Sequence, residues 1–481
     1  MSVRRALTFA FLDRYASLII GIGSSMILAR LLTPAEVAVF SIATVLLGFL
    51  ATVRDLGASQ YLVRERGLDN ERIRAVWAVQ LGLGMLLAAA VAAGGAPVAA
   101  IYGEPRMHDI MLVLAIGYLI NPFGSLTHAW LTRELRYEAI ALTRFVSTLA
   151  GALLSIALAL RNHGPMALAL GNLASTAVNA ALLLPLRPRW FPWLPGLRDV
   201  RRVISFGGAL TSANLLWSFA KGAPELLLGK LQSLTAAGLY SRASGLVAMF
   251  QRFVTDVVHG VALSWFAREA RRGGDYSQAF VRATGYVTAI GWTFCLLIVC
   301  LAHPIIWVLF GPQWVGAVDL ARLLAVALAF GVPVTLCFAA LVAAGAVTSV
   351  LKATVASTFV MIVLAVPAAW FGLLSMGWAN IVAAAFDAAL FMWLTQTKIG
   401  FQWAALRASL LKSGSVALCA ALAPAAALLG FGARPDEIVA PIAVGTLGGA
   451  VGFLAGVVAF GHPIREELLR LWGKVHTPRG A

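Results

Sequence analysis

The residues of this chain that could do chemistry are charged side chains set within long apolar stretches. They occur mostly as neighbours of opposite charge: Asp13 with Arg14, Lys221 with Glu225, Arg252 with Asp256, and Asp319 with Arg322. Residues three or four apart share a helix face, so such pairs can neutralise each other. Arg242 and Asp387 have no local partner. Because an ionisable group in hydrocarbon costs about 2.5–3.5 kcal/mol, these residues predict a bundle interior or an aqueous cavity.

Some of these polar residues have a second interpretation. Asp13, Arg14 and Asp319 lie near predicted helix ends, from which their side chains could reach the membrane surface. Amides also occur within the apolar stretches, and each could bond a neighbouring helix or line a cavity for sugar hydroxyls. They are Asn121, Asn172, Asn179, Asn214, Asn380 and Gln396.

The composition requires these groups to be held by membrane-spanning helices. Of the 481 residues, 60% are apolar and 12% charged, whereas a soluble domain has about 25% charged residues. This excludes a soluble enzyme, a disordered chain and a nucleic-acid-binding protein. The four cysteines and seven histidines lack the spacing of a metal site, so we predict no metal.

A helix needs about 20 apolar residues to cross the hydrocarbon layer. Such stretches predict an all-α polytopic membrane protein with about 14 transmembrane helices and no extramembrane domain. Their centres lie near Ile20, Val45, Met85, Val113, Leu154, Val178, Leu216, Val247, Phe294, Ala327, Phe359, Ala384, Ala420 and Gly449. With a cytoplasmic amino terminus, 27 of the 37 Lys and Arg residues fall on the cytoplasmic side and five in outer loops. The positive-inside rule therefore predicts that both termini are cytoplasmic.

The segment 187–202, RPRWFPWLPGLRDVRR, is unlike the rest of the chain. Its three prolines cannot continue a helix, so it is predicted to be a cytoplasmic linker. It separates an N-terminal six-helix lobe (1–186) from a C-terminal six-helix lobe (203–397), and residues 398–481 add two helices and a cytoplasmic tail.

The chain repeats itself after this linker. VRRALTF at 3–9 matches VRRVISF at 200–206, and LARLLTPAEVAVFS at 28–41 matches LGKLQSLTAAGLYS at 228–241. The offset changes from 197 to 200, so one copy has about three more residues in its first helix. Six spans separate the copies, which predicts a parallel pseudo-twofold repeat. In transporters built in this way, the substrate binds between the halves near mid-membrane.

Three segments resemble the polysaccharide-export flippases, the Wzx-like oligosaccharide flippase branch of the MOP superfamily that also holds MATE exporters. They are ILARLLTPAEVAVFSIATVLLGFLATVRDLGASQYLVRER from Ile27, GLYSRASGL from Gly238, and HPIIWVLFGPQW from His303. One departure is Ala38, where family members usually have glycine; the second copy keeps it at Gly238.

The resemblance implies a flippase that moves a lipid-diphosphate-linked oligosaccharide, typically on undecaprenol, across the bacterial inner membrane by alternating access, for lipopolysaccharide, O-antigen or exopolysaccharide biosynthesis. It implies substrate-binding roles for Arg14, Lys221, Arg242, Arg252 and Arg322. It also implies charge-partner or ion-coupling roles for Asp13, Glu225, Asp256 and Asp387, with a proton or sodium gradient and no cofactor. The expected partners are membrane lipids, a polysaccharide polymerase and glycosyltransferases, and no nucleic acid.

Two alternatives remain open from the sequence. A MATE-like cation-coupled exporter of small amphipathic molecules would commonly have about twelve spans and an acidic cavity, which the extra spans and the arginines disfavour. A membrane glycosyltransferase or polymerase would carry a large outer loop with catalytic acids or histidines. The predicted outer loops are short, and the first, Arg30 to Glu36, has one carboxylate, so we do not expect an enzyme.

Overall fold

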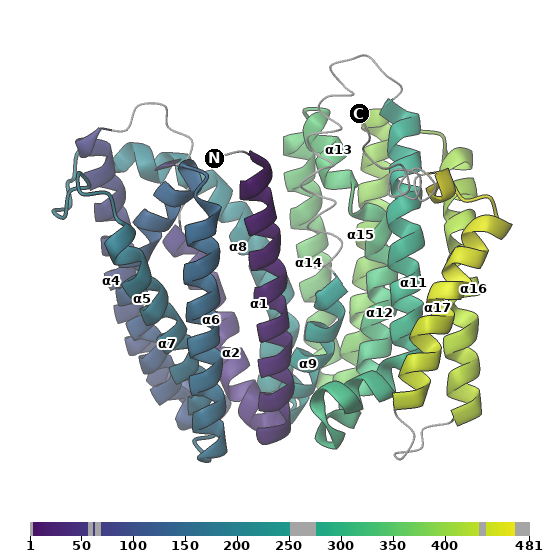
Figure 1. The fold of residues 1–481 in the computed structure, drawn as a ribbon, viewed down its shortest axis with the longest axis horizontal. Coiled ribbons are helices and arrows are strands. Elements are labelled where there is room, and N and C mark those ends of the chain that lie inside the picture. Colours follow the sequence, from purple (N-terminus) through teal and green to yellow (C-terminus); the bar gives the residue numbers. More distant parts are fainter. Residues whose placement is uncertain (1–2, 56–60, 63–68, 251–275, 432–438, 467–481) are drawn as a thin grey trace, which may run out of the picture. The chain divides into compact units, whose positions relative to one another are not determined.

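The computed structural model describes residues 3–55, 61–62, 69–250, 276–431 and 439–466, and every regular element within these ranges is a helix (Figure 1). The chain divides into two units, Met1–Gly238 and Leu239–Ala481. The first unit holds α1 (Val3–Leu31), α2 (Pro34–Asp55), α4 (Asn70–Tyr102), α5 (Arg106–Arg133), α6 (Tyr137–Leu160), α7 (Met166–Leu183), the 3-10 helix η1 (Leu184–Leu186) and α8 (Val200–Leu231).

The second unit begins within α9 (Leu234–Phe250). Its further helices are α11 (Tyr276–Phe310), the 3-10 helix η3 (Pro312–Ala317), α12 (Val318–Val334), α13 (Cys337–Ala343), α14 (Val347–Phe371), α15 (Leu373–Ile399), α16 (Trp403–Phe431) and α17 (Val439–Ala459).

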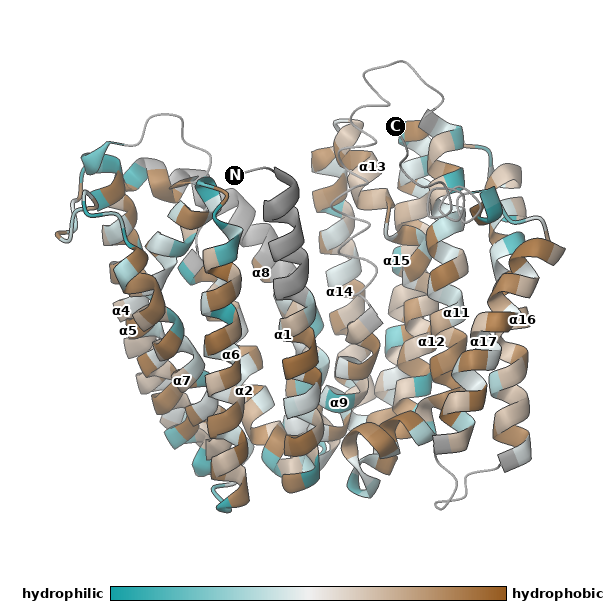
Figure 2. Cartoon of the chain, viewed as in Figure 1, coloured by the Kyte–Doolittle hydropathy of each residue, from teal (hydrophilic) through white to brown (hydrophobic). Residues whose placement is uncertain are grey.

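The chain is a multi-pass membrane protein. Within the described ranges, eleven helical segments are long and apolar enough to cross a membrane. Together with α1, α8 and α9 they are consistent with the fourteen predicted spans. Figure 2 shows apolar residues along the bodies of the helices and polar residues at their ends and in the connections. Large apolar side chains such as Phe371 (82% exposed) and Leu429 (86%) face outward, as lipid contact requires.

The sequence repeat appears as two matching helix pairs. The first helix has 29 residues in α1 and 32 in α8, the difference of three that the shifted offset predicts. The helices end at Leu31 and Leu231, and the next ones begin at Pro34 and Leu234.

The helices of the first unit pack through small residues and short apolar side chains. α6 lies against α1 and α7, α5 against α4 and α7, and α8 against α2 and α4. Gly151 on α6 and Gly171 on α7 meet so closely that a Cβ on Gly151 would be 2.7 Å from the Gly171 carbonyl oxygen. Such contacts are how membrane helices approach each other where the hydrophobic effect gives no driving force.

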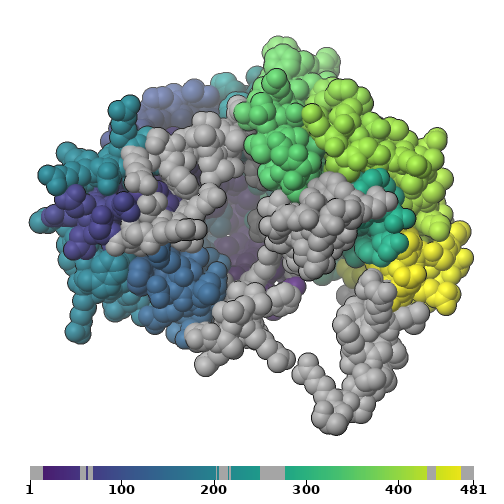
Figure 3. Space-filling model, turned by 90° about the horizontal axis from the view of Figure 1, so that it is seen from above, coloured from purple at the N-terminus to yellow at the C-terminus, as the bar shows by residue number. Residues whose placement is uncertain are grey.

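In the second unit, α11 is the common neighbour of α12, α16 and α17, while α15 packs on α12 and α14. The space-filling view in Figure 3 shows the yellow α17 beside the light-green α16. The last two helices therefore join the second unit through α11. The lobe limits predicted from the sequence follow the repeat, with α8 as the first helix of the second lobe, and they stay a prediction. The two units of the structure instead meet at residue 238, because α8 packs on α2 and α4 of the first unit.

Candidate functional site

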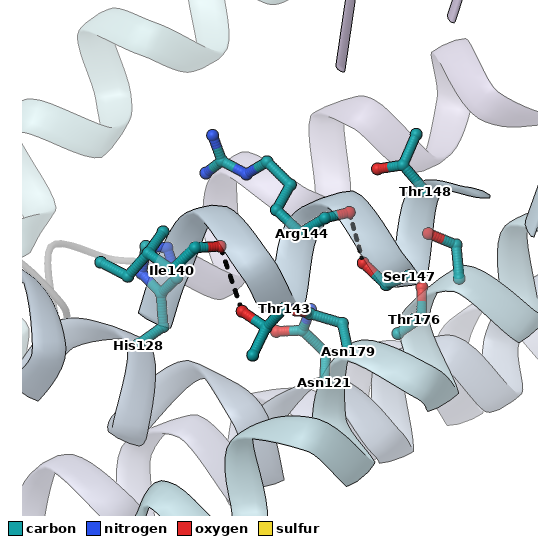
Figure 4. Close-up of a pocket in the computed structure, with 10 residues that line it drawn as sticks. Asn121, His128, Ile140, Thr143, Arg144, Ser147, Thr148, Thr176 and Asn179 are labelled. Atoms are coloured by element: carbon teal, nitrogen blue, oxygen red, sulfur yellow. Dashed lines mark hydrogen bonds between the residues drawn. The ribbon is translucent and has the colours of Figure 1, made fainter. Parts of the chain in front are cut away.

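A polar cavity of about 230 Å³ lies between α5, α6 and α7 in the first unit (Figure 4). Of the ten described residues that line it, nine have polar side chains and none is a carboxylate. The lining residues are Asn121, His128, Ile140, Thr143, Arg144, Ser147, Thr148, Ser175, Thr176 and Asn179. A concave site with convergent polar groups in an otherwise apolar bundle is the expected form of a binding site.

Helical periodicity explains how these side chains converge. The α6 residues lie at positions 140, 143, 144, 147 and 148, which is the i, i+3, i+4, i+7, i+8 spacing of one helix face. Ser175 and Asn179 are one turn apart on α7, and Asn121 and His128 are two turns apart on α5. Each of the three helices therefore carries a stripe of polar residues on one face, and the packing of the helices directs these three faces toward the cavity.

The hydroxyl groups of the cavity are held by their own helices. Thr143 Oγ1 donates to the Ile140 carbonyl at 3.1 Å, and Ser147 Oγ donates to the Arg144 carbonyl at 3.0 Å, as drawn in Figure 4. Thr176 Oγ1 donates in the same way to Asn172 at 3.0 Å. A hydroxyl that donates to its helix keeps lone pairs that can accept, and an asparagine amide both donates and accepts. The cavity can therefore hydrogen-bond a ligand rich in hydroxyl groups.

The cavity begins close to one end of the three helices. Arg144 is seven residues into α6, about 10 Å from its start, while Asn179 is four residues from the end of α7 and His128 five from the end of α5. Arg144 is exposed, and in Figure 4 its guanidinium extends away from the two asparagines. The site thus has a charged rim and a neutral, hydroxyl- and amide-lined interior.

The predicted basic residues occupy several different places. Arg14 and Asp13 belong to α1, but their side chains are outside the described part, as are Arg252 and Asp256 altogether. On α8, Lys221 is exposed, whereas Glu225 one turn later is 7% exposed.

Arg242 joins two of the segments that carry the family resemblance. Its guanidinium carbon lies 5.4 Å from the centre of the Phe310 ring and 5.1 Å from that of Trp314, so it makes cation–π contacts. Phe310 and Trp314 are fully buried at the junction of α11 and η3.

Arg322 and Asp319 form an ion pair of 3.0 Å on α12, and Arg322 Nε also donates to the Val299 carbonyl of α11 at 3.2 Å. Asp387 is half-buried on α15 beside Ser357 of α14. Of the five predicted site residues whose side chains the structure describes, Lys221, Glu225, Arg242, Arg322 and Asp387, none lines the cavity, and the proposed roles of all nine stay predictions. Two residues from the predicted amides, Asn121 and Asn179, do line it.

A family model described as polysaccharide biosynthesis protein matches residues 27–319, more than half of the chain. The chain belongs to this polysaccharide biosynthesis protein family. The succinoglycan biosynthesis transport protein ExoT of Rhizobium meliloti is 24% identical over 300 residues, which are 62% of this chain and 60% of that protein. The lipopolysaccharide biosynthesis protein WzxC of Escherichia coli is 21% identical over 315 residues, 64% of each chain. The matched part thus spans about 60% of ExoT and 64% of WzxC.

The fold of this polysaccharide biosynthesis protein is also found among solved structures. The lipid II flippase MurJ in an inward closed conformation has a TM-score of 0.77 and 12% identity, with 94% of this chain and 99% of MurJ covered. The Wzx-like resemblance and the all-α membrane fold predicted from the sequence are thereby confirmed.

Proposed function

We propose that the protein is a flippase that moves a lipid-diphosphate-linked oligosaccharide to the outer leaflet of the bacterial inner membrane for surface polysaccharide biosynthesis. The observation that carries the proposal is the hydroxyl- and amide-lined cavity within the segment that the family model matches. The relatives named as transport and lipopolysaccharide biosynthesis proteins support it.

The physics of the cargo requires a protein of this kind. A diphosphate and a chain of sugars cannot cross hydrocarbon unaided, because each polar group would lose its hydrogen bonds with water. The prenyl tail can stay in lipid while the headgroup passes through a polar path between helices. The cavity is smaller than the roughly 300–1,000 Å³ of drug-sized ligand sites, so it suits one sugar unit at a time.

Alternating access is the proposed mechanism, and the contacts between α8 and α4 are the proposed closed side of the transport path. Tyr102 Oη donates to the Leu226 carbonyl at 3.2 Å, and Lys230 Nζ donates to the Ile101 carbonyl at 2.6 Å. These bonds hold the far end of α8 against α4, at the end of the unit opposite the linker. We propose that this seam closes the outer side and opens when cargo is released, with both chain termini in the cytoplasm.

The coupling ion and the partners are parts of the same proposal. Glu225 and Asp387 are the described acidic candidates for proton or sodium coupling. A polysaccharide polymerase and glycosyltransferases would use the flipped product or supply the cargo. The MATE-like alternative is disfavoured by the cavity, because a cation exporter needs carboxylates and the described lining residues include none. We propose transport alone, with no catalytic step.

Transport by purified protein in proteoliposomes tests the function. Prenyl-diphosphate oligosaccharides from a synthetic panel are incorporated into the proteoliposome membrane. A glycosidase is added outside; it cannot cross the membrane, so it cleaves only the headgroups that have reached the outer leaflet. We expect wild-type protein to accelerate crossing for at least one saccharide. The double variant Thr143→Val, Asn179→Leu should slow it roughly 5- to 150-fold, since one lost pair of hydrogen bonds costs about 1–3 kcal/mol.

Ser415→Ala is the matched control. Its hydroxyl is exposed on α16 and donates to its own helix at 3.0 Å, as the cavity hydroxyls do. It should transport at the wild-type rate. Equal rates for the double variant and wild type would remove the cavity from the cargo path, and no crossing with any saccharide would reject the flippase.

A further inference from the structure

The linker between η1 and α8 is an ordered segment fixed to the beginning of α4. Arg74 Nε donates to the Leu194 carbonyl at 3.1 Å, and the Gly196 amide donates to the Arg74 carbonyl at 3.1 Å. Trp77 Nε1 donates to the Trp193 carbonyl at 3.0 Å. These three hydrogen bonds place the linker beside the first two turns of a transmembrane helix.

Aromatic packing fixes the inner side of the linker. The Arg187 guanidinium carbon lies over the rings of Trp193 and Trp77, 3.9 and 5.1 Å from their centres, and its Nη2 donates to the Pro192 carbonyl at 2.6 Å. Burial lowers the pKa of Arg187, whose side chain is almost enclosed. Phe191 is buried against Trp130, with ring centres 5.4 Å apart. Arg187 and Phe191 are therefore internal parts of the fold.

The rest of the linker surface combines large apolar and cationic side chains that the described part of the first unit leaves exposed. Trp190 is 47% exposed, Trp193 59%, Leu194 67% and Leu197 86%. Arg189, Arg198 and Arg201 are exposed beside them. We call these seven residues the linker face. Exposed tryptophan and leucine beside arginine are typical of a segment lying in the membrane interface, with rings among the headgroups and charges on the phosphates.

The length of the adjoining helices places the linker face at that depth. α4 has 33 residues and is about 50 Å long, against a hydrocarbon layer of about 30 Å. This excess length allows its first turns to extend into the headgroup layer, and the linker is bonded to those turns. The span formed by α7 and η1 ends at Leu186, one residue before the linker begins.

We propose that the linker face binds anionic phospholipid on the membrane surface at the beginning of α4. Trp190, Trp193, Leu194 and Leu197 enter the headgroup layer, and Arg189, Arg198 and Arg201 contact lipid phosphates. Arg198 also pairs with Glu71 at 2.8 Å, and both side chains are largely exposed, so the guanidinium can serve both partners. Bound lipid would hold the joint between the two repeat copies at a fixed depth. The inference does not depend on the cargo.

A fluorescent label at Leu197 tests the proposal on the full-length protein. Leu197→Cys is made with the four native cysteines replaced by alanine, and the labelled protein is placed in nanodiscs of phosphatidylcholine, with or without phosphatidylglycerol. We expect the label to be quenched by headgroup-attached nitroxide and shielded from iodide, with both effects stronger when phosphatidylglycerol is present. Arg189→Gln should lower the preference for phosphatidylglycerol about fivefold, the factor for one arginine at an anionic surface.

Arg161 supplies the control, since it is exposed in the loop at the opposite end of α6. Arg161→Gln should leave the preference unchanged, and elution of each variant as a single symmetric peak shows that it is folded. A label open to iodide in both lipids would show a solvated loop and overturn the proposal. Equal quenching in both lipids would overturn the part that assigns anionic lipid.

Discussion

The two copies of the repeated helix pair share the positions of the turn between their helices but differ in what their second helices contact. In the first copy, Thr33 and Glu36 cap each other: the Thr33 amide and hydroxyl donate to Glu36 Oε2 at 2.9 Å, and the Glu36 amide donates to Thr33 Oγ1 at 3.3 Å. In the second copy, Ser233 Oγ accepts from the Ala236 amide at 3.1 Å, and Ala236 stands where the first copy has Glu36. The second turn has half of the capping box.

The difference follows from where each turn packs. Glu36 lies next to Gly164 and Arg106, so the first turn is tied to the neighbouring loops of its own copy. The second turn is tied to the first: Gly238 touches the Pro34 carbonyl, and a Cβ there would overlap it. This explains why position 238 is a glycine, whereas the equivalent position of the first copy holds the fully buried Ala38. The turn of the first pair thus packs on loops of its own copy, whereas the second helix of the second pair packs on the first pair.

The largest effect should come from filling the contact at Gly238. Gly238→Ala places a methyl group against the Pro34 backbone, which has no flexible end that could move aside. We expect the free energy of unfolding to fall by about 1–3 kcal/mol, as for other overpacked sites. Thermal unfolding of the purified protein in detergent measures it.

Gly245 on the same helix is the control, because a Cβ there would meet nothing within 4 Å. Gly245→Ala should keep or raise the stability by up to about 1 kcal/mol through helix propensity. If Gly238→Ala and Gly245→Ala change the free energy of unfolding by the same amount, the close contact at Gly238 does not distinguish the two copies.

The caps should give the next largest effect. Thr33→Ala removes both halves of a reciprocal cap and should cost about 1–2 kcal/mol. Ser233→Ala removes a single bond and should cost about 0.5–1 kcal/mol. Chemical unfolding of the two variants side by side gives the comparison, and a larger loss for Ser233→Ala would contradict it.

The sequence was sufficient for the spans and the repeat because both depend on local pattern. Apolar length identifies a membrane helix wherever it packs, and the shift in offset from 197 to 200 records the longer first helix directly. The turn residues Thr33 and Ser233 act within three positions of themselves, so their role is also local.

The cavity could be predicted only in part. Asn121 and Asn179 can be identified from the sequence because an amide is conspicuous in an apolar helix. Thr143 and Ser147 cannot, since a hydroxyl that bonds its own helix is a weak polar signal. Their convergence depends on how α5, α6 and α7 are rotated about their axes, which is set by tertiary contacts such as Gly151 against Gly171. Arg242 illustrates the same limit, because its aromatic partners are distant in sequence.

A smaller effect is expected at the seam between α8 and α4. Lys230→Met removes the bond to the Ile101 carbonyl and should lower the free energy of unfolding by about 0.5–1.5 kcal/mol. Its counterpart in the first copy, Arg30, is exposed at the end of α1. Lys352→Met, an exposed lysine on α14, should change the stability by less than about 0.5 kcal/mol. Equal losses of unfolding free energy in the two variants would show that the hydrogen bond from Lys230 to Ile101 does not stabilise the fold.

The smallest effect should be a pH dependence that arises from the ion pair of Glu104 and Arg106, which lies beside the turn of the first copy. The hydrogen bond from Arg106, with Nε 2.8 Å from Glu104 Oε1, lowers the pKa of Glu104 below its ordinary value. Because the folded pKa is lowered, this carboxylate stabilises the fold above the unfolded pKa of about 4.3, and the contribution is lost as the pH falls through the lower folded value. The negative charge of Glu36 also interacts with Arg106, whereas the second copy has the uncharged Ala236 at the position of Glu36. Stability measured from pH 7 down to pH 3 should therefore decline less steeply in Glu104→Gln than in wild type. Identical slopes would mean that the pair of Glu104 and Arg106 adds no electrostatic stabilisation between α4 and α5.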